Sequence, residues 1–129
     1  MGFNSVLPWD FYTYQAKAHE FANYNDKEIK GFDEELKFED SGLEYPVLGL
    51  TEEAGEVAGK FAKIIRDKKG IITQEDKNEI VKELGDVLWM LSEIAQRLDC
   101  SLQHVAHVNI EKLTSRLKRG KINGSGDNR

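Results

Sequence analysis

The 129-residue sequence predicts an all-α protein in a single domain that spans residues 1–129. Apolar residues recur every three to four positions in four segments, which is the period of a helix. The stretches between these segments contain residues that start or stop helices, such as Pro, Gly, Ser and Thr. No stretch alternates apolar and polar residues like a half-buried strand, so no sheet is expected.

The first helix is expected over residues 11–24, with Asp10 as its N-cap. Residues 25–44 follow, and they are acidic and contain Gly31 and Gly42. They therefore predict a long loop, a feature that in a small domain is often functional.

The second helix is predicted over residues 46–66, with Pro46 suited to its first turn. The third is expected from a Thr73 cap to about Leu98. Both helices are amphipathic, and their predicted core faces are apolar stripes. These stripes consist of Val47, Leu50, Ala54, Val57, Phe61 and Ile65, and of Ile80, Leu84, Val87, Leu91, Ile94 and Leu98.

Ser101 is the expected cap of a fourth helix that ends near Arg119, just before Gly120. Residues 121–129 contain a Gly-Ser-Gly-Asp-Asn run and predict a flexible tail. The sequence therefore predicts four helices, one long loop and one tail.

The net charge of −5 is unevenly distributed along the chain. Residues 1–60 carry 13 acids and 5 bases, whereas residues 61–129 carry 10 acids and 13 bases. The acidic front half argues against nucleic-acid binding by the whole surface. The longest apolar runs, such as residues 87–91, are too short for a membrane span. With Cys100 as the single cysteine and no signal-peptide pattern, the sequence predicts a cytoplasmic protein.

Two predicted helices each carry a pair of acids three residues apart, Glu53 with Glu56 and Glu83 with Asp86. This spacing places two carboxylates on neighbouring turns, pointing the same way. Such acids repel one another, and a hard dication such as Mg²⁺ relieves the repulsion because it prefers oxygen ligands. The spacing alone also fits two solvated helix faces, and it does not choose between the two interpretations.

The fourth helix carries Asn109, Lys112 and Arg116 along one edge of its apolar stripe. One interpretation is a row of donors that faces an anionic ligand. The other is a hydrogen-bonded core asparagine beside two bases whose stems lie along apolar surface. Trp89 points away from the stripe of the third helix, which favours a subunit contact or a ligand pocket.

Three segments resemble the MazG-like nucleoside triphosphate pyrophosphohydrolases, which belong to the all-α NTP pyrophosphatase superfamily. They read LTEEAGEV at residues 50–57, KELGDVLW at residues 82–89 and NIEKLTSR at residues 109–116. The resemblance extends over residues 46–129. It implies a four-helix fold and the conversion of a (d)NTP and water to a (d)NMP and pyrophosphate.

The resemblance also implies roles for seven residues. The Mg²⁺ ligands, with Mn²⁺ as an alternative ion, would be Glu53, Glu56, Glu83 and Asp86. Either Glu53 or Glu56 would act as the catalytic base. The substrate would be bound by Asn109, Lys112 and Arg116.

Four short amphipathic helices cannot enclose a triphosphate site alone, so a homodimer or homotetramer with a shared helical bundle is expected. The predicted partners are therefore a nucleoside triphosphate and a second copy of the chain, with no membrane and no nucleic acid. The alternative is a non-enzymatic helical adaptor, which would use the apolar stripes only for packing.

Overall fold

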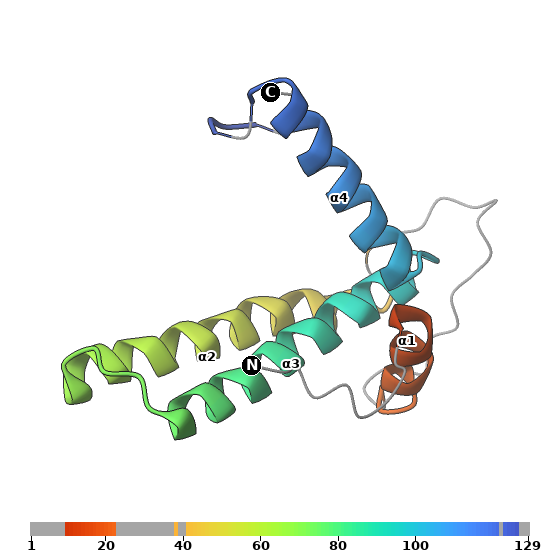
Figure 1. Cartoon of the computed structure of the whole chain (residues 1–129). Coiled ribbons are helices and arrows are strands. Elements are labelled where there is room, and N and C mark those ends of the chain that lie inside the picture. Colours follow the sequence, from red (N-terminus) through yellow and green to blue (C-terminus); the bar gives the residue numbers. More distant parts are fainter. Residues whose placement is uncertain (1–9, 23–37, 39–40, 122, 127–129) are drawn as a thin grey trace.

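A computed structural model of the chain describes residues 10–22, 38, 41–121 and 123–126. These residues form four helices and no strand, which confirms the all-α prediction. α2 and α3 lie side by side as a long antiparallel hairpin, α1 packs beside α3, and α4 projects away from the hairpin (Figure 1). The helices are α1 (Phe11–His19), α2 (Glu44–Lys68), α3 (Gln74–Arg97) and α4 (Leu102–Lys118).

α1 begins as predicted but ends earlier than predicted. The Asp10 carboxylate accepts a hydrogen bond from the Thr13 amide at 2.8 Å and caps the helix. The helix ends at His19 because the next two amides bond to carbonyls three residues back, which tightens the turn. The prediction of a helix to residue 24 is therefore wrong at its end, and residues 23 and 24 lie outside the described residues.

α2 is longer than predicted by about one turn in total. It begins at Glu44, so the buried Pro46 lies in its first turn, where a missing amide hydrogen is tolerated. It ends at Lys68, and Lys69 and Gly70 then adopt positive φ angles of 52° and 79°. The predicted loop over residues 25–44 lies mostly outside the described residues.

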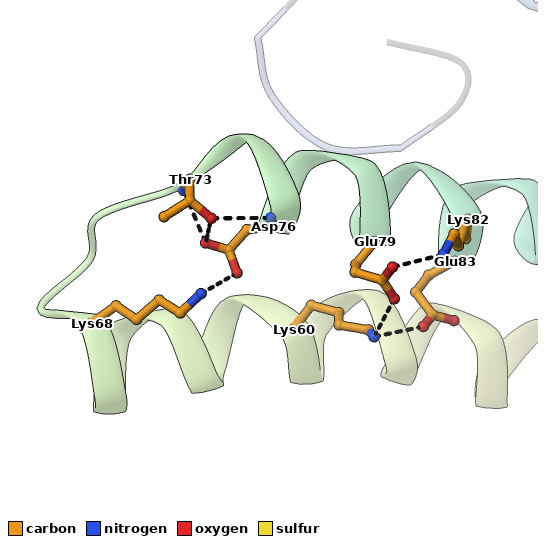
Figure 2. Close-up of polar contacts among 7 residues, drawn as sticks. All are labelled: Lys60, Lys68, Thr73, Asp76, Glu79, Lys82 and Glu83. Carbon is orange, nitrogen blue, oxygen red and sulfur yellow. Dashed lines mark hydrogen bonds and ion pairs between the residues drawn. The ribbon is translucent and has the colours of Figure 1, made fainter.

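α3 begins at the predicted Thr73 cap, and the structure shows that this cap is reciprocal. The Thr73 hydroxyl accepts from the Asp76 amide at 3.2 Å, and the Thr73 amide donates to the Asp76 carboxylate at 2.9 Å. Lys68 donates to the same carboxylate at 2.6 Å and ties the end of α2 to α3 (Figure 2). These contacts, Lys68 first, lower the pKa of Asp76 to about 2.

α4 has the predicted bounds. The Ser101 hydroxyl accepts from the His104 amide at 3.0 Å, and Gly120 follows the helix with a φ of 63°. Residues 121 and 123–126 are the described part of the predicted tail. One of them is tied to the helix, because the Arg116 guanidinium donates to the Gly126 carbonyl at 3.3 Å. The flexibility of the tail stays a prediction.

The apolar stripes predicted for α2 and α3 are mostly not buried in the single chain, although Ile80 of the α3 stripe is. Val47, Phe61 and Ile65 of α2 are exposed, as are Leu84 and Leu91 of α3. The reason is that over most of its length each helix of the hairpin has one neighbour, since α4 turns away (Figure 1). The buried apolar side chains in the described residues include Ala18, Pro46, Ile64, Ile80, Met90, Ala95 and Leu102.

A close approach between α2 and α3 depends on a glycine. A Cβ at Gly49 would lie 2.7 Å from the Met90 sulfur, and Met90 is almost fully buried. The absence of a side chain at Gly49 therefore lets the two helices pack tightly there. Within the described parts of the chain, no helix is both long and apolar enough to cross a membrane.

Candidate metal centre

Three of the four predicted acids come together between α2 and α3. Glu53 of α2 and Glu83 and Asp86 of α3 each place one carboxylate oxygen within 4.8 Å of the other two. Glu53 and Glu83 are partly buried, whereas Asp86 is exposed. We call these three residues the acidic cluster. The antiparallel packing of the two helices creates it, because each acid lies on the side of its helix that faces the other.

The surroundings of Glu53 in the acidic cluster raise the pKa of its carboxyl group. Partial burial raises the pKa of the Glu53 carboxyl, and the negative charges of Asp86, Glu52, Glu83 and Glu56 raise it further. An ion or a proton in the cluster would therefore relieve a repulsion that is present in the folded chain. Oxygen ligands in this arrangement suit a hard divalent cation.

The fourth predicted acid, Glu56, is exposed and is not part of the acidic cluster. It lies one turn beyond Glu53 on the same helix, close enough for its charge to act on the Glu53 carboxyl. Its role as a metal ligand or as a base stays a prediction.

A lysine that the sequence reasoning missed lies against the acidic cluster. The Lys60 ammonium is 3.1 Å from a Glu83 oxygen and 3.6 Å from a Glu79 oxygen (Figure 2). The hydrogen bond to Glu83 is the main reason why the pKa of Lys60 is raised. The available signal was spacing, since Lys60 follows Glu53 by seven residues and Glu56 by four, on one face of α2.

An aromatic cavity of about 560 Å³ opens beside the acidic cluster, between α1 and α3. Asp86 belongs both to this cavity and to the cluster. The volume lies in the usual range for small-molecule sites. Its lining is Tyr14, Lys17, Ala18, Phe21, Gly85, Asp86 and Trp89.

Trp89, for which the sequence favoured a subunit contact or a ligand pocket, lies in the wall of this cavity, and the choice between the two stays a prediction. Its indole donates to the Ala18 carbonyl at 3.1 Å, which holds the ring against α1. Three cavity residues of α1, Tyr14, Lys17 and Ala18, escaped the sequence reasoning, as did Phe21 in the turn after the helix, although the spacing of i, i+3 and i+4 marks one helix face. Burial raises the pKa of Tyr14 on this face, as do the charges of Asp86 and Glu93.

Buried polar contacts hold α1 in place and so fix the cavity. The fully buried Glu93 carboxylate lies 3.1 Å from the His19 ring nitrogen Nδ1. The Gln15 side chain donates to the Cys100 carbonyl at 3.0 Å and accepts from the Leu102 amide at 2.9 Å. These contacts join α1 to α3 and to the start of α4, and buried groups of this kind tolerate little displacement.

The donor row predicted on α4 does not meet the acidic cluster within one chain. Asn109 is exposed, Lys112 is half-buried, and Arg116 is buried where it donates to the Gly126 carbonyl. α4 leads away from the hairpin, while the acidic cluster lies near the middle of α3 (Figure 1). The described chain therefore brings together Glu53, Glu83 and Asp86, but not the α4 row.

The fold and the site define a class: a helical-hairpin protein whose two long helices share a carboxylate site next to an aromatic cavity. The family model described as the MazG nucleotide pyrophosphohydrolase domain matches residues 43–120. The chain belongs to this family, which confirms the resemblance drawn from the motifs. Residues 121–129 lie outside the matched range.

Two relatives extend this finding. The chain is 52% identical over 88 residues to the "Gene 37 protein" of Mycobacterium phage L5, covering 68% of this chain and 77% of the relative. It is 32% identical over 98 residues to the "Uncharacterized protein YvdC" of Bacillus subtilis (strain 168), covering 72% of this chain and 92% of the relative. No solved structure matches the chain at a significant level.

Proposed function

We propose that the chain is a divalent-metal-dependent nucleoside triphosphate pyrophosphohydrolase, which converts a (d)NTP and water to a (d)NMP and pyrophosphate. The observation that carries this proposal is the acidic cluster, in which three carboxylates from two helices place oxygens within 4.8 Å of one another. Membership of the MazG family supports the reaction type.

The residues of the acidic cluster fit a hard cation, because each offers a carboxylate oxygen and together they are negatively charged. Glu53, Glu83 and Asp86 would hold Mg²⁺, or Mn²⁺ in its place, and Glu56 could add a fourth carboxylate. When bound, the ion supplies positive charge that offsets the negative charge of the triphosphate.

One carboxylate would accept the proton of the attacking water while the bond between the α- and β-phosphates breaks. The two candidates are Glu53 and Glu56. The raised pKa of Glu53 brings it nearer to neutral pH, where a general base is more effective. Glu56 is exposed and open to water. Both therefore remain part of the proposal.

The aromatic cavity would receive the nucleobase. Trp89, Tyr14 and Phe21 line it, and stacking of a base on an aromatic ring contributes about 1–3 kcal/mol per base. Because Asp86 lines the cavity and also belongs to the acidic cluster, a base in the cavity would place its phosphates beside the carboxylates.

The phosphate donors would be Asn109, Lys112 and Arg116 of a second copy, in a homodimer or a homotetramer. α4 of a single chain leads away from the hairpin of α2 and α3 (Figure 1), and the acidic cluster lies on that hairpin. Helices α2, α3 and α4 also leave large apolar side chains exposed, which a second copy of the chain would cover. Among these are Leu48, Ile65, Val81, Ile110 and Leu117, each more than 60% exposed.

The test is pyrophosphate release from a panel of canonical, deoxy and damaged nucleoside triphosphates, with Mg²⁺ and with a chelator. We expect release of one pyrophosphate per nucleoside monophosphate, and only with the metal. Absence of release from every nucleotide would refute the proposal and would favour the helical adaptor.

A further inference from the structure

Lys60 differs from the other lysines of the hairpin in what it contacts. Lys68 pairs with Asp76 in the cap of α3, and Lys82 pairs with Glu79 one turn away on its own helix. Lys60 reaches from α2 to Glu83 of α3, a member of the acidic cluster (Figure 2). Among the described residues, Lys60 is the cation seen in an ion pair with that cluster.

The surroundings of Lys60 make this contact more than an ordinary surface pair. The Lys60 side chain is 27% exposed and the Glu83 side chain 18%, whereas the Lys82 and Glu79 side chains are 71% and 42% exposed. Exposed ion pairs contribute little, but partly buried charges are less screened by water and salt. The ammonium therefore offsets part of the repulsion among the cluster carboxylates.

We propose that Lys60 is a resident counter-ion of the acidic cluster, which holds the Glu83 carboxylate when no divalent ion is bound and competes with that ion for it. This proposal rests on the metal site proposed above. The Glu83 oxygen that lies 3.1 Å from the ammonium is one that a dication would otherwise attract. Lys60 acts through Glu83, so it is a positioning residue and not a catalytic one.

Two effects of Lys60 on metal affinity have the same sign. The ammonium must yield its contact with Glu83 when the carboxylate turns to the ion, and its positive charge also repels a dication bound nearby. Removing the charge should therefore tighten metal binding. The expected change is about tenfold, which corresponds to about 1.4 kcal/mol.

The test is Mn²⁺ affinity, measured from the electron paramagnetic resonance signal of the free ion in the absence of nucleotide. Lys60→Met keeps the length of the stem and the helix preference but removes the charge. We expect it to bind Mn²⁺ about tenfold more tightly than the parent. Lys60→Arg, which restores the charge, should stay within threefold of the parent. The matched control is Lys82→Met, which removes a lysine paired with Glu79 and should also stay within threefold.

Thermal unfolding gives a second readout that does not depend on activity. Without divalent ions, Lys60→Met should melt below Lys82→Met, because its carboxylates repel one another without a counter-ion. With Mn²⁺ it should show the larger gain in melting temperature. Circular dichroism checks that each variant is helical, and Lys60→Gln replaces Lys60→Met if the latter is not.

The outcomes separate this proposal from the metal site itself. A parent that binds no Mn²⁺ refutes both. A parent that binds Mn²⁺, with Lys60→Met of equal or weaker affinity, refutes only the role of Lys60. An equal gain in Mn²⁺ affinity in Lys82→Met would also refute the role of Lys60, because the gain would then come from the overall charge of the protein.

Discussion

Asp86→Asn removes one charge from the acidic cluster without changing the shape of the side chain. Asp86 is the exposed member of the cluster, and it also lines the aromatic cavity. If the three carboxylates form a metal site, this variant should lose activity and also become more stable without metal. Few substitutions at a structural position have both effects, so the pair of results is diagnostic.

The size of the stabilisation follows from the geometry. The cluster oxygens of Asp86 and Glu53 lie within 4.8 Å, and two unit charges at that distance repel by about 0.9 kcal/mol in water and about 3.5 kcal/mol at an effective dielectric of 20. Because Asp86 is exposed, the value near the water limit applies. We count only the repulsion between Asp86 and Glu53. The repulsion between Asp86 and Glu83 is left out because Lys60 already offsets the charge of Glu83. The metal-free variant should be about 1 kcal/mol more stable, which raises its melting temperature by about 4 °C.

The assay is thermal unfolding at pH 7 with chelator and with Mg²⁺, combined with pyrophosphate release. The parent should gain stability from Mg²⁺ and the variant should gain little, while kcat/KM should fall by at least about a hundredfold. Glu56→Gln, outside the cluster, tests the fourth acid in the same way and should also abolish turnover. An Asp86→Asn variant that melts lower than the parent in chelator, or that keeps full activity, would refute the metal site.

Four further predictions follow from the same geometry. Lys112→Ala should lower kcat/KM by about 30- to 700-fold (about 2–4 kcal/mol) at saturating Mg²⁺, and a fall of less than about threefold would show that the α4 row lies at a solvated edge. Trp89→Ala should raise KM about tenfold with a smaller change in kcat, and steady-state kinetics with an unchanged KM would exclude stacking in the cavity. Ile110→Asp replaces an apolar side chain that is 62% exposed in the single chain with a charged one. Sedimentation should therefore show a dimer or larger for the parent and a monomer for the variant. An active monomeric parent would contradict the helical bundle shared between two copies. Asp76 has a folded-state pKa of about 2, below its ordinary value of 3.8, so its stabilising effect is present above about pH 4 and is lost as the pH falls towards 2. Asp76→Asn should therefore melt below the parent at pH 7, and the difference in melting temperature should close between about pH 4 and pH 2. A difference that is constant across this range would contradict the stabilising role of the ionised Asp76 carboxylate.

The sequence by itself determined the helices of this protein, because the signals that start and stop a helix are local. Asp10, Thr73 and Ser101 each bond to the amide three residues further on, as their residue types predict. The largest departures were the end of α1 and the bounds of α2, which extends two residues further at each end than predicted. No Gly or Pro marks the end of α1, and the tighter turn after His19 carries Phe21 into the wall of the cavity.

Sequence spacing also identified the acids of the cluster, since residues three apart on a helix point the same way. It could not show that Glu53 meets Glu83 and Asp86 while Glu56 stays outside, because the rotation of α2 against α3 decides this. The close contact of Gly49 with Met90 helps to set that packing.

Only the tertiary structure revealed the cavity and the place of Lys60. Tyr14 and Trp89 are 75 residues apart in the chain, and they line the same cavity because Glu93, Gln15 and the Trp89 indole bind α1 to α3 and α4. The ion pair between Lys60 and Glu83 likewise joins two helices. Periodicity describes one helix at a time, so it predicts which face is apolar but not which neighbour covers it. In the single chain the predicted faces of α2 and α3 stay largely exposed, because the path of α4 is set by its contacts with α1 and α3 and not by its own sequence pattern.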